Sequence, residues 1–254
     1  MTDNRKLRRI ADGLLRARAG ARLMSGETPA SGPANRAEAY AVQRLVASRL
    51  GPVGAFKTGR RSPGEEPIMA PIPAAMVRAS PARFGPGELN LIGIELEVAF
   101  LVHRPLPHAE DPQFAARARD CVYPLAAFEI IDSRLADHEA AGALWKLADN
   151  QVNGGFVHGA PVRDWVDIDL ATLDARLEID GKTVLDGSAT VPGGDAFDIF
   201  SAFARTVGSH CGGLVPGQYV TTGTLTGVRF IESGRRVAGH IAGLGSVTVR
   251  FPAH

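Results

Sequence analysis

The chain has 254 residues, of which 45% are hydrophobic and 22% are charged, and 28 Lys and Arg residues face 27 Asp and Glu residues. This composition is typical of a folded globular protein and excludes an intrinsically disordered one. The formal net charge of +1 argues against nucleic acid or an anionic membrane surface as the main partner. We therefore expect neither nucleic-acid nor membrane binding.

The beginning of the chain and its cysteines indicate the compartment. The first nine residues are rich in charge, and no apolar run follows that is long enough for a signal sequence or a membrane span. Cys121 and Cys211 are too few for a disulfide framework, and neither belongs to a CxxC pair. Both are expected to be reduced and buried, in a cytoplasmic protein.

Two helices are predicted in the N-terminal part. Apolar residues recur at helical spacing from Leu7 to Leu15, and again from Val42 to Leu50, with a break rich in Gly, Pro and Ser between them. Gly51 and Pro52 end the second helix. Residues 60–90 carry many prolines, so they predict an ordered loop with short strands, where a lid over a site could lie.

The rest of the chain is predicted to be rich in β-structure. Alternation from Ile92 to Phe100 predicts a strand with one face toward a core. Further elements are expected as strands at 125–131, 218–225, 236–241 and 247–251, a hairpin at 177–184 with an Asp-Gly turn, and a helix that Asp195 caps and Gly212-Gly213 closes. The pattern indicates an α+β fold, with an N-terminal helical region at 1–55 packed on a β-rich catalytic domain at 56–254.

Two carboxylates stand on one face of the first predicted strand. Glu95 and Glu97 are two residues apart, so both side chains leave the same side of the strand. One interpretation of this spacing is an edge strand whose outer face is exposed to solvent. However, the pair lies within an apolar run that suggests cover on both faces, and covered like charges need a cation between them. Oxygen ligands alone would favour Mg²⁺ or Mn²⁺.

A third acid is available in the second strand. Glu129 lies inside the apolar segment, where an unpaired carboxylate would cost several kcal/mol. Asp132 follows at the end of the strand and has a simpler interpretation as an ion-pair partner of Arg134. Glu129 is therefore the preferred third ligand, with Asp132 as its competitor.

Lysine is scarce, at four residues against 24 arginines, so a lysine in an apolar context is a candidate for proton transfer. Lys57 and Lys146 both have apolar neighbours. For Lys146 we favour a surface position, in which the aliphatic stem packs on apolar neighbours and the ammonium group stays in water. No phosphate-binding loop, paired-histidine zinc motif or nucleophile elbow is present in the sequence.

Taken in order, several stretches resemble the fumarylacetoacetate hydrolase superfamily and, within it, the 2-oxopent-4-enoate hydratase branch of aromatic catabolism. They are 39–43, Phe56-Lys57-Thr58-Gly59, Gly93-Ile94-Glu95-Leu96-Glu97, 129–134, 148–150 with 154–159, 222–226 and 244–251. The likeness extends over nearly the whole chain, and the order and spacing of the stretches carry it.

The resemblance implies a mixed β-roll core of the family's C-terminal-domain type with an N-terminal helical extension, in a homo-oligomer. It also implies a Mg²⁺ or Mn²⁺ ion held by Glu95, Glu97 and Glu129. Lys57 matches the active-site lysine of the family's KxG motif, and Thr224 matches a residue near the substrate carboxylate.

The activity implied is hydration of a short 2-hydroxy-2,4-dienoate or 2-oxo-4-enoate. One position departs from the pattern, because Ile68 stands where hydratases carry an acid thought to be catalytic. Glu65 or Glu66 is a weak candidate to replace it. The alternatives are therefore a 4-oxalocrotonate-type decarboxylase or an acylpyruvate hydrolase on the same metal site, and a catalytically silent homologue that binds a dicarboxylate or serves as a partner subunit. Association with a related decarboxylase or hydratase is also implied.

Overall fold

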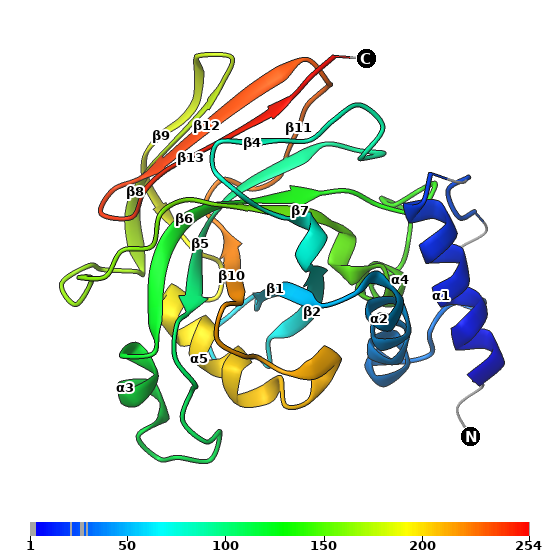
Figure 1. Cartoon of the computed structure of the whole chain (residues 1–254), viewed down its shortest axis with the longest axis horizontal. Helices are drawn as coiled ribbons and strands as arrows, with labels where there is room; N and C mark the ends of the chain where they lie inside the picture. Colours follow the sequence, from blue (N-terminus) through cyan, green and yellow to red (C-terminus); the bar gives the residue numbers. More distant parts are fainter. Residues whose placement is uncertain (1–3, 21, 26–27, 29, 254) are drawn as a thin grey trace.

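A computed structural model of the chain describes residues 4–20, 22–25, 28 and 30–253, and contains two β-sheets and a group of helices (Figure 1). The α-helices are α1 (Asn4–Arg18), α2 (Arg36–Leu50), α3 (Phe114–Arg119), α4 (Ala143–Ala148) and α5 (Ala196–Thr206). The strands are β1 (Val53–Gly59), β2 (Ile68–Pro73), β3 (Val77–Ala79), β4 (Ala82–Arg83), β5 (Gly93–Val102), β6 (Val122–Ile131), β7 (Asn153–His158), β8 (Thr172–Ile179), β9 (Lys182–Thr190), β10 (Tyr219–Thr224), β11 (Arg229–Phe230), β12 (Arg235–Ile241) and β13 (Gly245–Phe251).

The larger sheet is mixed and strongly curled. Its strand order is β2-β1-β10-β5-β6-β7-β3, with β11 paired to β5, and β1 runs parallel to β10 while β5 and β6 are antiparallel. The smaller sheet has the order β4-β13-β12-β8-β9 and stacks on the larger one (Figure 1). Gly239 of β12 makes this stacking possible, because a Cβ there would lie 2.6 Å from Leu96 and 2.9 Å from Phe128. The α+β fold with a curled β-roll core is thus confirmed.

Strand β5 is covered on both faces. Leu96, Val98 and Phe100 point into the main core, which includes α5 and the smaller sheet. The alternate residues, Glu95 and Glu97 among them, are also buried, except for half-buried Leu101. The alternation by itself predicts one face toward a core, whereas the apolar run around Glu95 and Glu97 suggests cover on both faces, and the curled sheet provides that cover.

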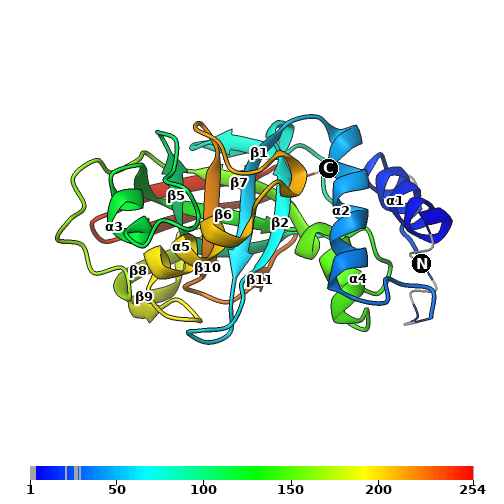
Figure 2. The same cartoon turned by 90° about the horizontal axis from the view of Figure 1, so that it is seen from below.

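The N-terminal helices form a separate apolar cluster at one end of the molecule (Figure 2). Leu7, Leu14 and Val46 pack there with Trp145 of α4. Helix α2 begins at the predicted break, where the Asn35 side chain accepts a hydrogen bond from the Glu38 amide. Both predicted helices are confirmed, whereas the division of the chain at residue 55 stays a prediction.

Other elements differ from expectation in detail. The hairpin of β8 and β9 has the predicted Asp180-Gly181 turn with positive φ at both residues. Segment 60–90 contains a six-residue strand, β2, which tolerates its prolines because it is an edge strand. Helix α5 begins after Asp195 as predicted, but it ends at Thr206, before the predicted Gly212-Gly213.

Both cysteines are half-buried free thiols, so the expectation of full burial was wrong. Among the described residues, no helix is both long and apolar enough for a membrane crossing.

Candidate functional site

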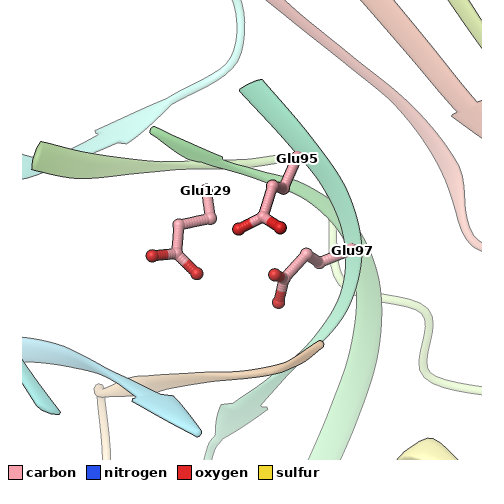
Figure 3. A group of neighbouring side chains, drawn as sticks. All are labelled: Glu95, Glu97 and Glu129. Carbon is pink, nitrogen blue, oxygen red and sulfur yellow. The ribbon is translucent and has the colours of Figure 1, made fainter. Parts of the chain in front are cut away.

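Three glutamates converge inside the curled sheet (Figure 3). Glu95 and Glu97 project from the same face of β5, and Glu129 projects from β6 directly opposite Glu95 in the antiparallel register. One carboxylate oxygen from each lies within 4.8 Å of the others. The residues are 7%, 2% and 0% exposed, respectively. The structure therefore brings together the three predicted ligands.

The donor set fits a hard divalent cation. The Oε2 atom of Glu129 is buried and has no hydrogen-bond partner within the described part of the chain. Three buried carboxylates near one lysine leave an excess of negative charge, which a dication would neutralise. Carboxylate oxygens without sulfur or imidazole suit Mg²⁺ or Mn²⁺.

Asp132 takes no part in this cluster. Its carboxylate accepts hydrogen bonds from the Asn90 and Leu91 amides and lies 3.6 Å from Arg134. Of the two acids that the sequence left in competition, only Glu129 points toward the Glu95 and Glu97 side chains, and its role as a metal ligand stays a prediction.

Lys57 of β1 completes the cluster. Its Nζ lies 2.7 Å from Oε1 of Glu129 and donates a hydrogen bond to the Gln151 carbonyl at 3.1 Å. Asn153 Nδ2 donates to the same Glu129 oxygen at 3.0 Å. Burial by itself would lower the pKa of Lys57, but Glu129 and the two other carboxylates outweigh burial and raise this pKa. Lys57 is therefore a charged ammonium group inside the site.

Burial also governs the two carboxylates of β5. It raises the pKa of Glu95 to about 7, against the opposing effect of Lys57. Burial, followed by repulsion from Glu129 and Glu95, raises the pKa of Glu97 well above its usual range. Glu95 and Glu97 therefore bind protons more readily than exposed glutamates do, and a bound cation would favour the release of these protons.

A bulge in β10 aims a backbone donor at the site. The register with β5 shifts between Thr221 and Thr224, and the Gly223 N–H donates to Oε2 of Glu97 at 3.0 Å. Gly223 has φ of +115°, which favours glycine. Thr224 follows the bulge and lines the cavity beside Glu97, where the sequence placed a substrate-binding residue.

A strained turn supplies the carbonyl that contacts Lys57. Asn150, Gln151 and Val152 have φ of +49°, +53° and +55°, although none of them is glycine. Such backbone is costly, most of all for β-branched Val152, and is typical of functional sites. Sequence analysis missed the roles of Gln151, Asn153 and Gly223, because no local pattern reveals a backbone contact or this turn.

The cluster forms one side of a cavity of about 630 Å³. Its wall includes Lys57, Thr58, Gly59, Arg60, Arg61, Glu65, Glu66, Ile68, Glu95, Glu97, Lys146, Gln151, Pro192, Gly223, Thr224, Arg36, Ala143, Leu144 and Leu147. Ile68 thus presents an apolar side chain where the hydratase pattern has an acid. Glu65 and Glu66 lie on the exposed loop between β1 and β2, which borders the cavity.

Comparison with known proteins identifies the family. A family model described as fumarylacetoacetate hydrolase C-terminal matches residues 52–251. A 2-keto-4-pentenoate hydratase of Paraburkholderia phymatum is 31% identical over 158 residues, 62% of this chain and 60% of that protein. The match thus spans about 60% of the length of that relative.

Two solved structures have the same fold. The 4-oxalocrotonate decarboxylase from Pseudomonas putida G7, complexed with magnesium and adipate, superposes with a TM-score of 0.82 at 22% identity, covering 99% of this chain and 98% of that one. Fumarylpyruvate hydrolase from Pseudomonas aeruginosa, in complex with Mn²⁺ and pyruvate, has a TM-score of 0.56 at 19% identity, covering 79% and 89%. With the family model matching most of its length, the chain belongs to the fumarylacetoacetate hydrolase family.

Proposed function

We propose that this protein is a Mg²⁺- or Mn²⁺-dependent lyase that hydrates a short 2-hydroxy-2,4-dienoate, or its 2-oxo-4-enoate tautomer, to a 4-hydroxy-2-oxo acid. The observation that carries this proposal is the buried triad of Glu95, Glu97 and Glu129, with Lys57 in contact, at the wall of a cavity large enough for such an acid. The hydratase relative supports the reaction class.

The three glutamates would hold the ion. When bound, the ion would supply a Lewis acid and a template for the carboxylate and 2-oxygen of the substrate. The positive charge in contact with these carboxylates comes from Lys57, which Glu129 and the Gln151 carbonyl hold in place. We assign to this ammonium group the stabilisation of negative charge that develops on the 2-oxygen, and the relay of a proton.

Thr224 is the candidate for orienting the substrate. It lines the cavity beside Glu97, and its Oγ1 accepts a hydrogen bond from the Thr226 amide at 3.1 Å. The Thr224 hydroxyl hydrogen has a long contact, 3.4 Å between oxygens, with the Thr226 hydroxyl, which a ligand oxygen could replace. A hydroxyl at this place would bind the substrate carboxylate and set the direction of the carbon chain in the cavity.

Absorbance of the conjugated dienoate tests the proposal directly. We expect loss of the ultraviolet band with Mg²⁺ or Mn²⁺, no loss after chelation, and a decrease in kcat of at least about 10²-fold in Glu97→Gln. Glu110→Gln, at an exposed glutamate, is the matched control and should retain activity. Turnover that survives both chelation and Glu97→Gln would refute the metal role, and turnover by the purified protein alone would remove the silent-homologue alternative.

Decarboxylation of a 4-oxalocrotonate-like acid is the second candidate. Ile68 favours it, because loss of CO₂ requires no group to activate water, whereas hydration does. The fold neighbour that is a 4-oxalocrotonate decarboxylase is consistent with this alternative. Product analysis separates the two reactions, since hydration gives one hydroxy acid and decarboxylation gives CO₂.

A further inference from the structure

Buried polar atoms without a hydrogen-bond partner gather at residues that adjoin Lys57. Among the residues that the structure describes, four side-chain atoms are of this kind: Oε2 of Glu129, Oδ1 of Asn150, Oγ1 of Thr221 and Oγ of Ser201. Glu129 forms the ion pair with Lys57, and Asn150 precedes Gln151, whose carbonyl accepts from Lys57 Nζ. Thr221 is the register partner of Lys57 across β1 and β10. Three of the four atoms therefore belong to the immediate neighbours of one ammonium group.

Thr221 shares the inner face of the larger sheet with Lys57. Register partners on neighbouring strands lie about 5 Å apart and project from the same face. Thr221 has Lys57 as its partner on one side and Ala99 on the other. Ala99 is two residues from Glu97 on the inner face of β5 and belongs to a buried apolar cluster. The fully buried hydroxyl of Thr221 is thus a polar group between an apolar layer and Lys57.

An unpaired buried hydroxyl lowers stability, because valine has nearly the same shape and would bury no polar atom. A threonine at this place is explained if a donor reaches its hydroxyl in another state of the site. Lys57 has such a donor, since Glu129 and the Gln151 carbonyl accept only two of the three N–H groups of its ammonium. The flexible lysine side chain also lets the ammonium group move while the backbone stays paired in β1.

We propose that Thr221 is a positioning residue for Lys57, whose ammonium group turns to the Thr221 hydroxyl when a divalent cation takes Glu129. This inference rests on the proposed function, in which the three glutamates hold that ion. Lys57 keeps the Gln151 carbonyl as an acceptor and exchanges the carboxylate for the hydroxyl. The exchange reduces the repulsion between the ammonium group and the ion, and it holds the lysine at the site for the reaction.

Thr221→Val tests this assignment, because it removes the hydroxyl and keeps the shape of the side chain. In the ion-free protein we expect an unchanged or higher melting temperature, since the hydroxyl has no partner in that state. Isothermal titration calorimetry should show Mn²⁺ binding weakened about 10-fold or more. At saturating Mn²⁺, kcat for the dienoate should fall by about the same factor with little change in KM. Thr221→Ser should restore most of both quantities, because it keeps a hydroxyl.

A double-mutant cycle with Lys57→Met ties the effect to the lysine. In the Lys57→Met background, Thr221→Val should leave the Mn²⁺ affinity unchanged, because no ammonium group has to move. Ser201→Ala is the matched control, since it also removes a buried hydroxyl without a partner, but on helix α5. It should leave both the Mn²⁺ affinity and kcat unchanged.

Three results would overturn the role of Thr221 while leaving the proposed function intact. The first is unchanged Mn²⁺ affinity in Thr221→Val, and the second is equal weakening of Mn²⁺ binding with and without Lys57. The third is a lower melting temperature of the ion-free Thr221→Val protein, which would assign the hydroxyl a purely structural role. Absence of Mn²⁺ binding by the unmodified protein would instead remove the proposed function, and the inference with it.

Discussion

At the scale of single residues, Lys57 and a bound cation would compete for the same carboxylate. The ammonium group lies 2.7 Å from Glu129, one of the three candidate ligands. A lysine in this place partly neutralises the site when no ion is present, and it repels an ion that enters. A lysine next to the proposed metal site would therefore lower the affinity for the ion, a cost that a catalytic role would explain.

Lys57→Met should separate these two effects. We expect the variant to bind Mn²⁺ more tightly than the unmodified protein, because one positive charge has been removed, and to lose at least about 10²-fold in kcat. Calorimetry and dienoate absorbance measure the two quantities. Full activity in Lys57→Met would contradict the assigned role, as would an activity loss caused only by weaker metal binding.

A second residue-scale feature is the buried ion pair behind the site. Arg134 is fully buried, and its Nε lies 2.5 Å from Oδ1 of Asp149. The other oxygen of that carboxylate, Oδ2, accepts hydrogen bonds from the Ser133 hydroxyl and the Arg134 amide. The Asn153 carbonyl accepts a hydrogen bond from the same guanidinium. The ion pair of Arg134 and Asp149 therefore supports the strained turn that contains Gln151.

Asp149→Asn should lower the free energy of unfolding by about 3 kcal/mol, because it removes the nearer counter-charge of a buried guanidinium and leaves only Asp132, at 3.6 Å. Urea titration measures this change. Asp186→Asn is the matched control, since Asp186 is 62% exposed and 3.5 Å from Arg176, and its effect should be below about 1 kcal/mol. Similar effects of the two substitutions would contradict the importance of the buried pair.

At the scale of elements, helix α2 is tied to the cavity wall through a buried polar network. Gln43 donates from Nε2 to the carbonyls of Met69 and Leu147, and its Oε1 lies 2.9 Å from Nε2 of His210. The network connects α2 with β2, α4 and the segment after α5. Burial, and to a lesser extent Arg44, lower the pKa of His210 to about 4.

His210 should therefore make stability depend on pH. Its pKa is about 6.5 in an unfolded chain and about 4 in the folded one, so between these values the unfolded state binds more protons. The stability contribution is complete above pH 6.5 and is lost as the pH falls toward 4, by on the order of 2 kcal/mol.

Urea midpoints at pH 7 and pH 4.5 measure the effect. The decrease between them should be smaller in His210→Asn, which cannot titrate in this window but can still hydrogen-bond to Gln43. An equal decrease in both proteins would show that other groups are responsible.

At the scale of the whole molecule, metal binding should stabilise the fold. The three ligands come from β5 and β6 at the centre of the larger sheet, and unfolding would separate them. A free ion at 100 times its dissociation constant would add about 2.7 kcal/mol to the unfolding free energy. For a chain of this size we expect a rise in melting temperature of roughly 5–10 °C.

Differential scanning calorimetry with and without Mn²⁺ measures that shift. Glu97→Gln should reduce it strongly, whereas Glu110→Gln should leave it unchanged. An equal shift in all three proteins would indicate that the ion acts at another place.

The homo-oligomer implied by the family resemblance stays a prediction. Sedimentation velocity at micromolar concentration should show a species larger than the 26.8 kDa chain. A single monomeric boundary would refute it. The measurement is best made with and without Mg²⁺, because ligands that favour one assembly change its apparent stability.

Many secondary-structure elements and candidate site residues of this protein can be predicted from the sequence alone, because the spacing of apolar and polar residues acts locally. Alternation in β5 places Glu95 and Glu97 on one face, and a lone acid in an apolar strand singles out Glu129. Helical spacing and an Asp-Gly turn likewise predict α1, α2 and the β8–β9 hairpin.

Tertiary structure decided the rest, since those decisions depend on residues far apart in the chain. Antiparallel register, not spacing, separates Glu129 from Asp132, and the curled sheet buries the second face of β5. The contact of Lys57 with Glu129 joins residues 72 positions apart. Such contacts arise when strands pair and the sheet curls, so no local pattern in the sequence encodes them.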